Sequence, residues 1–157
     1  TQDRHLKVPE FWRGPFPCNF GDVHSPTQRN MAAPQATALC FGGTPPVVGI
    51  AESWNGTSWT EVADLNTARM EAGGAGTSST SALITNGESP PYTQKTELWN
   101  GTSWAESGDT ATAGRSQMGA AGTSSSGLVM GGLIPAVTAN TEEFSDPVYT
   151  IKTVTVS

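Results

Sequence analysis

Three glutamates recur at a constant spacing, and theirs is the pattern that most suggests chemistry. Glu52, Glu97 and Glu142 lie 45 residues apart. Two carboxylates that face one substrate can hydrolyse a glycosidic bond, but such a pair needs two different environments to separate the pKa values of its members. Repeated residues usually serve a repeated structure, so we expect these glutamates to accept hydrogen bonds from strand or turn amides. The alternative, an enzyme that uses the repeated acids, predicts that Glu97→Gln loses an activity.

A metal site is the second chemistry to consider, because cysteines and histidines occur close together in the sequence. The residues concerned are Cys18, His24 and Cys40, with His5 further upstream. Their spacing matches no paired zinc-ligand pattern, and a metal site needs three or four converging ligands. We therefore expect no metal and no cofactor. The two cysteines could form one disulfide or remain as free thiols, and the sequence leaves both open.

Serine is abundant, but its context does not indicate a nucleophile. The chain has no Gly-x-Ser-x-Gly segment, and both histidines precede residue 28, so a Ser-His-Asp arrangement has little to draw on. The glycine clusters near Gly73 and Gly119 lack the lysine of a phosphate-binding loop. They are typical of close backbone packing. We expect no catalytic residue and no enzyme activity.

Composition limits the fold class and the kinds of partner. The 157 residues include 18 Gly, 11 Pro, 21 Thr and 15 Ser, and only 14% are charged. No stretch keeps apolar residues at helical spacing, so an all-β domain is expected. The net charge of −6 argues against a nucleic-acid partner, which would require clustered Lys and Arg. No apolar run approaches the roughly 18 residues that cross a bilayer, so we expect no membrane insertion.

An internal repeat of about 45 residues organises most of the chain. The segment Trp-Asn-Gly-Thr-Ser-Trp occurs at residues 54–59 and again at 99–104, and an acid and two aromatic residues occupy the corresponding positions of a third copy. Large aromatic side chains bury much apolar area. The expected core anchors are therefore Trp54, Trp59, Trp99, Trp104, Phe144 and Tyr149.

Each copy predicts four short strands. A small-residue segment is followed by an apolar run that ends in Gly-Gly or Asn-Gly, then by the acid-x-aromatic segment, and an Asn-Gly hairpin leads to the last strand. A variable, proline-containing loop follows each apolar run, at residues 44–49, 88–94 and 133–139. Because proline disfavours a strand ladder, we expect none in these loops.

These features together resemble kelch-type repeats: the double glycine, the downstream acid and aromatic, the later tryptophan and the closing segment at residues 66–69. The closer resemblance is to degenerate kelch-like repeats with the phrase Trp-Asn-Gly-Thr-Ser-Trp, found in virion proteins of tailed phages, especially marine and cyanobacterial ones. It covers residues 29–157, with repeats at about 29–68, 69–114 and 115–157. The resemblance implies three four-stranded blades of a partial β-propeller.

Three blades raise the question of how the propeller closes. Propellers have four to eight blades, and an open array leaves strand edges that invite pairing. Two chains could complete six blades, the units could stack in a larger assembly, or the chain could be the end of a longer protein; we favour assembly. Residues 149–156 alternate polar and apolar side chains and predict either the fourth strand of their own blade or a strand added to a neighbouring sheet.

Residues 1–28 differ in composition from the repeats and predict an extended N-terminal arm, because several prolines separate large apolar groups. Such an arm cannot bury these groups within itself. It could lie along the repeat domain, which is residues 29–157, or across a neighbouring subunit. The side chains expected to make these contacts are Phe11, Trp12, Phe16 and Phe20.

The sequence therefore predicts a non-enzymatic structural protein on the surface of a phage virion, either a head decoration or a tail or fibre component. Its expected partners are further copies of itself and other virion proteins. The alternative is a receptor-binding or glycan-binding module that contacts host surface glycans through the variable loops.

Overall fold

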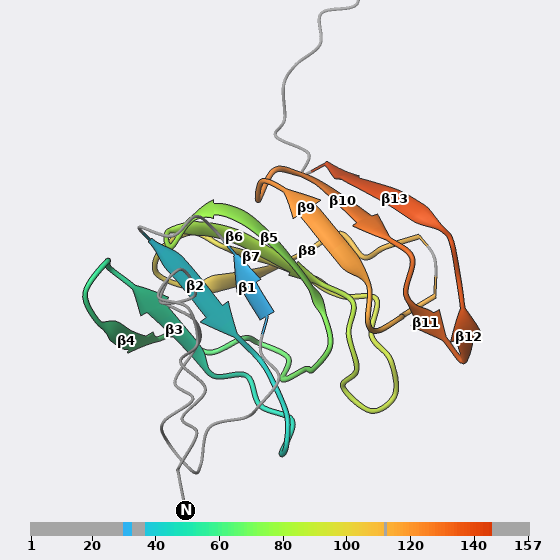
Figure 1. The fold of residues 1–157 in the computed structure, drawn as a ribbon, viewed down its shortest axis with the longest axis horizontal. Helices are drawn as coiled ribbons and strands as arrows, with labels where there is room; N and C mark the ends of the chain where they lie inside the picture. The colour runs from blue at the N-terminus through green and yellow to red at the C-terminus, as the bar shows by residue number, and fades with distance from the viewer. Residues whose placement is uncertain (1–29, 33–36, 112, 146–157) are drawn as a thin grey trace, which may run out of the picture.

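The structure is a computed structural model that describes residues 30–32, 37–111 and 113–145. In these residues the backbone forms thirteen short strands and no helix, which confirms the all-β prediction (Figure 1). Within the described part of the chain there is accordingly no helix that could cross a membrane. The strands form three small antiparallel sheets and one two-stranded hairpin.

The sheets follow one another along the chain. The first two are each built from four consecutive strands, and in the third the two-stranded hairpin is inserted before the last strand. The first sheet contains β1 (Asn30–Ala32), β2 (Ala38–Phe41), β3 (Ala51–Trp54) and β4 (Trp59–Val62). The second sheet contains β5 (Gly73–Ser78), β6 (Ser81–Thr85), β7 (Thr96–Trp99) and β8 (Trp104–Ser107). The third sheet contains β9 (Gly119–Gly122), β10 (Ser126–Met130) and β13 (Thr141–Ser145).

The repeated sequence produces repeated local structure. Trp54 pairs with Trp59 across the β3–β4 hairpin, and Trp99 pairs with Trp104 across the β7–β8 hairpin. In the second hairpin the side-chain oxygen of Asn100 accepts hydrogen bonds from the amides two and three residues further on, both at 2.9 Å. The glycine that follows has a φ of 94°, which favours glycine because it has no Cβ. The predicted Asn-Gly hairpins are confirmed.

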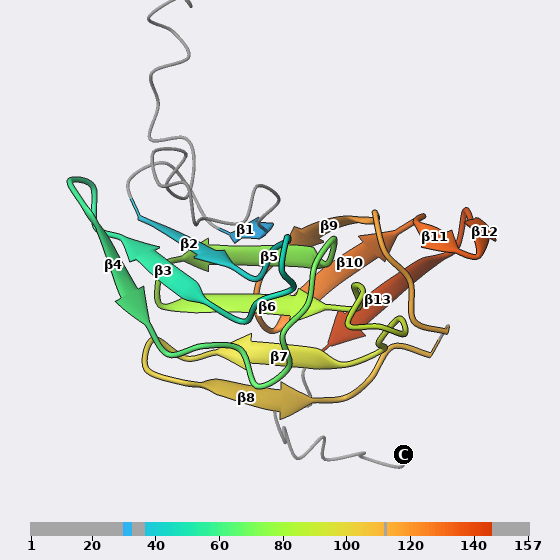
Figure 2. The ribbon, with the colours of Figure 1, turned by 90° about the horizontal axis from the view of Figure 1, so that it is seen from below.

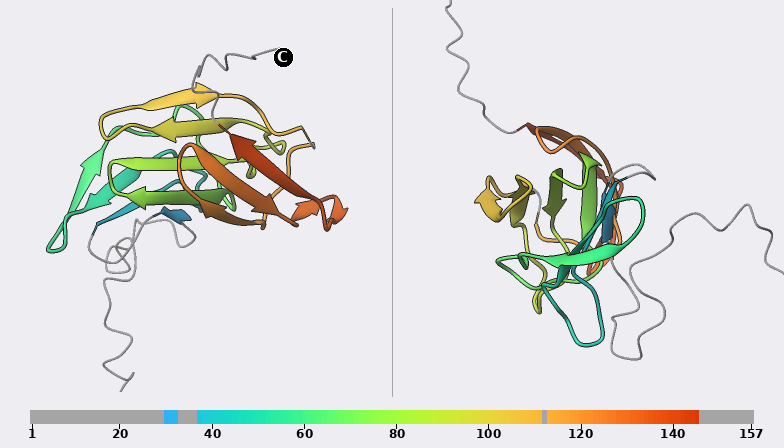
Figure 3. Two further views of the ribbon diagram at one scale, coloured as in Figure 1. Left: turned by 90° about the horizontal axis from the view of Figure 1, so that it is seen from above. Right: turned by 90° about the vertical axis from the view of Figure 1, so that its left-hand side faces the viewer.

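The first strands of the three sheets lie next to one another, since β5 contacts both β1 and β9. The sheets are therefore arranged side by side around these strands (Figures 2 and 3). We call the face of a sheet that is turned to the next sheet its forward face, and the opposite one its backward face. Leu39 and Phe41 lie on the forward face of the first sheet, and Ala82 and Ile84 on the backward face of the second; all four belong to one buried core.

The third sheet differs from the prediction in one loop. Residues 133–139 contain a short hairpin, in which β11 (Leu133–Ile134) pairs with β12 (Ala136–Val137). The expectation that proline excludes a ladder here was wrong, because Pro135 lies in the turn between the two strands and not at a paired position. The expected fourth strand at residues 149–156 and the arm at residues 1–28 lie outside the described residues.

Candidate functional site

Glu97 lies on β7, on the backward face of the second sheet, and its side chain is fully buried. Its carboxylate accepts hydrogen bonds from the backbone amides of Asn66 at 2.7 Å and Thr67 at 3.1 Å, both in the segment that follows the first sheet. A third hydrogen bond, of 2.5 Å, comes from Nη2 of Arg69. Both carboxylate oxygens are therefore bound to the preceding repeat, as the expected structural role requires.

Arg69 extends this connection to the backbone of the second sheet. Its guanidinium donates to the carbonyl oxygens of Asn86 at 3.2 Å and Lys95 at 2.6 Å, on either side of the β6–β7 loop. Burial lowers the pKa of Arg69 below its ordinary value, while the adjacent carboxylate of Glu97 acts in the opposite direction. A buried charge is tolerated only when it is paired and hydrogen-bonded, and Arg69 meets both conditions. We call this arrangement the Arg–Glu link.

The second and third sheets are joined by a corresponding Arg–Glu link. Arg115 Nη2 lies 2.7 Å from Oε1 of Glu142, and the arginine side chain is fully buried. Arg115 also donates to the carbonyl of Asn140 at 3.1 Å, and the amide of Ala111 donates to Oε2 of Glu142 at 2.7 Å. The expectation that the repeated glutamates bind backbone amides is confirmed for Glu97 and Glu142.

The three glutamates are held on three different sheets. Glu52 lies on β3, at the position that corresponds to Glu97 on β7 and Glu142 on β13, and it is half-buried. Each is on the backward face of its own sheet, so Glu97 and Glu142 meet the preceding repeat and not another glutamate. This arrangement is that of a repeated structural contact.

Sequence reasoning missed the arginines as partners of the glutamates, although a signal was present. Arg69 precedes Glu97 by 28 residues, and Arg115 precedes Glu142 by 27. Each arginine also stands shortly before the small-residue strand of its repeat. Arg29 occupies a similar place before the first small-residue segment but lies outside the described residues.

The tryptophans of the second sheet are packed against the first sheet. Trp99 and Trp104 have 3% and 6% of their surface exposed, and their ring centroids are 5.3 Å apart. Trp104 makes an edge-to-face contact with Phe41 at 5.2 Å, and its Nε1 donates to the carbonyl of Ala63 at 3.0 Å. Buried aromatic area and a satisfied indole N–H thus hold the second sheet against the first.

The corresponding tryptophans of the first sheet have the same mutual geometry in a more open environment. Trp54 and Trp59 have ring centroids 5.4 Å apart with an interplanar angle of 43°, the same angle as in the second sheet. Both are only half-buried, and among the described residues Nε1 of Trp54 has no hydrogen-bond partner. Among the remaining expected anchors, Phe144 is half-buried on β13, and Tyr149 lies outside the described residues.

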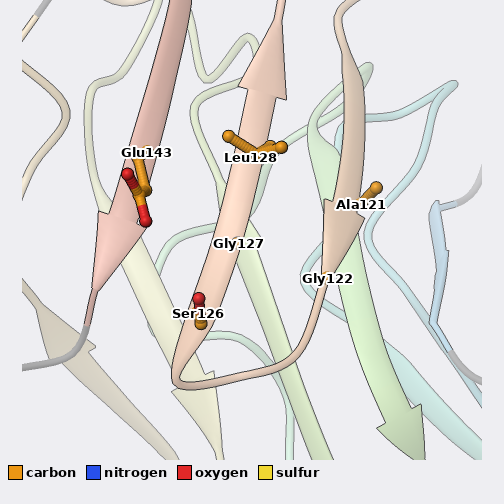
Figure 4. A pocket seen from close by; sticks show the side chains of 6 residues that line it. All are labelled: Ala121, Gly122, Ser126, Gly127, Leu128 and Glu143. Atoms are coloured by element: carbon orange, nitrogen blue, oxygen red, sulfur yellow. The ribbon is translucent and has the colours of Figure 1, made fainter.

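The forward face of the third sheet is hollowed and partly apolar. Leu128 and Met130 on β10 are 44% and 40% exposed, whereas Leu39 and Leu83 at the positions corresponding to Leu128 are 0% and 1% exposed. Next to Leu128 lies a shallow hollow of about 390 Å³ (Figure 4). It is lined by Ala121, Gly122, Ser126, Gly127, Leu128 and Glu143. With a single carboxylate and no basic residue in its lining, the hollow suits an apolar side chain better than a reaction centre.

The part of the chain that the structure describes holds no group of three or more His, Cys, Asp and Glu side chains suited to a metal ion. Cys40 is fully buried on β2 and is disulfide-bonded. Several residues named from the sequence lie outside the described ranges: His5, Cys18, His24 and the arm residues Phe11, Trp12, Phe16 and Phe20.

The fold and these contacts define an all-β repeat protein of side-by-side antiparallel sheets. No family model and no curated protein matches the sequence. The chain is similar to a solved structure described as "Structure of YjhT", with a TM-score of 0.60 and 14% sequence identity over 74% of this chain. At this identity the likeness concerns the fold alone. This chain spans 43% of the length of that one.

Proposed function

We propose that this chain is a non-enzymatic structural protein of a phage virion, built as an incomplete kelch-like β-propeller. The observation that carries the proposal is the complete engagement of Glu97, whose two carboxylate oxygens bind two backbone amides and Arg69 in a fully buried site. The repeated residue that is best suited to catalysis by its type thus joins one sheet to the next. A carboxylate held in this way has no free oxygen to offer a substrate.

A propeller arrangement is supported by the repetition of one contact between successive sheets. β5 contacts both β1 and β9, and an Arg–Glu link joins each sheet to the following one. A regular contact of this kind, continued, brings sheets around a common axis. Three sheets leave a forward and a backward face open, and the chain covers 43% of the similar structure, so more sheets than one copy supplies would complete the ring.

The virion setting rests on the resemblance carried by Trp-Asn-Gly-Thr-Ser-Trp. In the second sheet this phrase forms the β7–β8 hairpin and supplies the tryptophans that pack on the first sheet. The protein would be displayed on the particle, on the head or on the tail or fibre, and would associate with copies of itself and with other virion proteins.

Quantitative mass spectrometry of purified phage particles tests this role. Peptides of this chain should be present at a constant, integral copy number per particle and should persist through repeated purification. Their presence in infected cells but not in purified particles would overturn the virion assignment. Enzymatic activity that survives purification and is lost in a Glu97→Gln variant shown to remain folded would overturn the non-enzymatic assignment.

A second candidate function, receptor or glycan binding, is favoured by the position of the variable loops. The loops at residues 44–49, 88–94 and 133–139 all leave the same end of the sheets (Figure 1). A backbone hydrogen bond of 2.9–3.1 Å closes each of them, from Val48 to Gly43, from Thr93 to Gly87 and from Thr138 to Gly132. A constant frame that holds variable loops is suited to recognition. Saturable binding to host glycans, lost when residues 88–94 are replaced by glycine and serine, would support this function; absence of binding would exclude it.

A further inference from the structure

The two ends of the sheet array carry the two halves of one contact. Between the first and second sheets, the forward face supplies Phe41 and Leu39, and the backward face supplies Trp104, Trp99 and Ile84. The same contact continues at the next boundary, where a Cβ placed on Gly127 would lie 3.0 Å from the side chain of Leu83. The forward faces of the first and second sheets therefore each receive the backward face of the following sheet.

The forward face of the third sheet has the same design but nothing described covers it. The β10 position of Leu128 corresponds to Leu39 on β2 and to Leu83 on β6, and Met130 corresponds to Phe41. Leu39, Leu83 and Phe41 are at most 1% exposed, whereas Leu128 and Met130 are 44% and 40% exposed. Isolated surface leucines are ordinary, but here two apolar residues lie side by side next to a hollow, and clustered exposed apolar residues are typical of interaction surfaces.

The backward face of the first sheet supplies the complementary half. Trp54 and Trp59 are paired in the same geometry as Trp99 and Trp104, yet they are half-buried. Trp54 Nε1 is a buried donor with no partner in the part of the chain that the structure describes, and an unpaired buried donor has a cost that a bound neighbour would remove. On the same face Cys40 is fully buried, so the open part is the outer half that carries the two tryptophans.

We propose that the forward face of the third sheet binds the backward face of the first sheet of a second copy, head to tail. Met130 then takes the place of Phe41, and Trp59 of the second copy takes the place of Trp104. The occupant is a second copy because both halves of the contact are present on this one chain, and because the new interface continues the contact that the chain makes between its own sheets. The inference rests on the proposed propeller assembly.

The proposed contact is heterologous: the two surfaces that meet are different. In a dimer, the open forward face of each copy meets the open backward face of the other copy. The ring is then closed, with six sheets around one axis. Each copy has a net charge of −6, so the copies repel one another at low salt, and the repulsion is screened as salt is raised.

Sedimentation equilibrium of the full chain in high salt tests the proposal, with three variants. Leu128→Glu and Met130→Glu place a carboxylate in the proposed interface, and Val137→Glu is the matched control, because Val137 is 86% exposed on β12, away from the sheet face. We expect wild type and Val137→Glu to be dimers. We expect the dissociation constant to rise at least about tenfold in each of the other two variants, since a charge at an apolar contact centre is costly.

A monomeric wild type at submillimolar concentration would overturn the proposal, as would variants at Leu128 and Met130 that associate as tightly as wild type. Urea unfolding of each variant separates a lost interface from a lost fold, and both exposed positions should unfold as wild type does. The virion role is tested separately, on purified particles. It can therefore fail while the head-to-tail contact holds, and the contact can fail while the virion role holds.

Discussion

Arg69 and Glu97 form a fully buried ion pair that joins two sheets, with Nη2 and Oε1 2.5 Å apart. Arg69 follows the last strand of the first sheet, and Glu97 lies in the middle of the second. A buried pair of this kind is stable only because each charge has further partners, here two backbone amides on the carboxylate and three backbone carbonyls on the guanidinium. Together with the amides of Asn66 and Thr67, the pair fixes how the second sheet sits on the segment that follows the first.

Removal of the negative charge should therefore weaken the fold as a whole. Glu97→Gln leaves the buried guanidinium of Arg69 without a counter-charge, and we expect the free energy of unfolding to fall by roughly 3 kcal/mol or more. Glu106→Gln is the control, because the Lys95–Glu106 pair is 41% and 50% exposed and should contribute less than about 1 kcal/mol. Urea denaturation measures both; equal losses would contradict the structural role of the Arg–Glu link.

Truncation of Trp104 should also be costly. Trp104→Ala removes the edge contact with Phe41 and the hydrogen bond to Ala63, and large-to-small changes at buried aromatics lose about 3–5 kcal/mol. Val137→Ala, at a side chain that is 86% exposed, should change the free energy of unfolding by less than about 0.5 kcal/mol. Thermal unfolding followed by tryptophan fluorescence would reveal the difference, and a mild Trp104→Ala variant would refute the packing described here.

The glycine before Arg115 allows a close approach between two segments. A Cβ on Gly114 would lie 2.7 Å from the backbone of Thr93, so Gly114→Ala must displace backbone and should cost about 1–3 kcal/mol. Gly108→Ala is a matched control, since a Cβ there meets nothing within 4 Å, and it should be neutral or slightly stabilising. If both variants have wild-type melting temperatures, the approach of these segments is looser than described.

The β7–β8 hairpin depends on a single side-chain acceptor. Asn100→Ala removes two hydrogen bonds of 2.9 Å to the amides of Thr102 and Ser103, and we expect a loss of about 1 kcal/mol. Asn100→Asp keeps the acceptor and should recover most of that loss. Hydrogen exchange at these two amides should be faster in the alanine variant alone; unchanged exchange would contradict the assigned turn.

Much of the local structure could be predicted from the sequence because its signals are local. Asn-Gly between two tryptophans predicts a hairpin, and the structure has it at β3–β4 and β7–β8. The small-residue segments predict strands in close backbone contact, and β5 and β9 are neighbours. The β11–β12 hairpin was not predictable in the same way, because a proline is compatible with a hairpin when it lies in the turn, as Pro135 does.

The Arg–Glu links and the difference between the two Trp pairs could not be predicted from local patterns. Arg69 lies in the segment between the first and second sheets and meets Glu97, 28 residues further along the chain. Only the repetition of both residue types indicates the pairing. Trp59 and Trp104 follow the same five residues, Trp-Asn-Gly-Thr-Ser, yet Trp104 is 6% exposed and Trp59 is half-buried. Their environments differ because Trp104 has a preceding sheet to pack on.

The most direct test of head-to-tail assembly mixes two copies that are blocked on opposite faces. Leu128→Glu blocks the forward face of the third sheet, and Trp59→Glu blocks the backward face of the first, so each variant alone should sediment as a monomer. Their mixture retains one intact pair of faces and should form a one-to-one heterodimer, detectable by sedimentation velocity with one variant labelled. A mixture that stays monomeric while the wild type dimerises, or a single variant that still dimerises alone, would contradict the account.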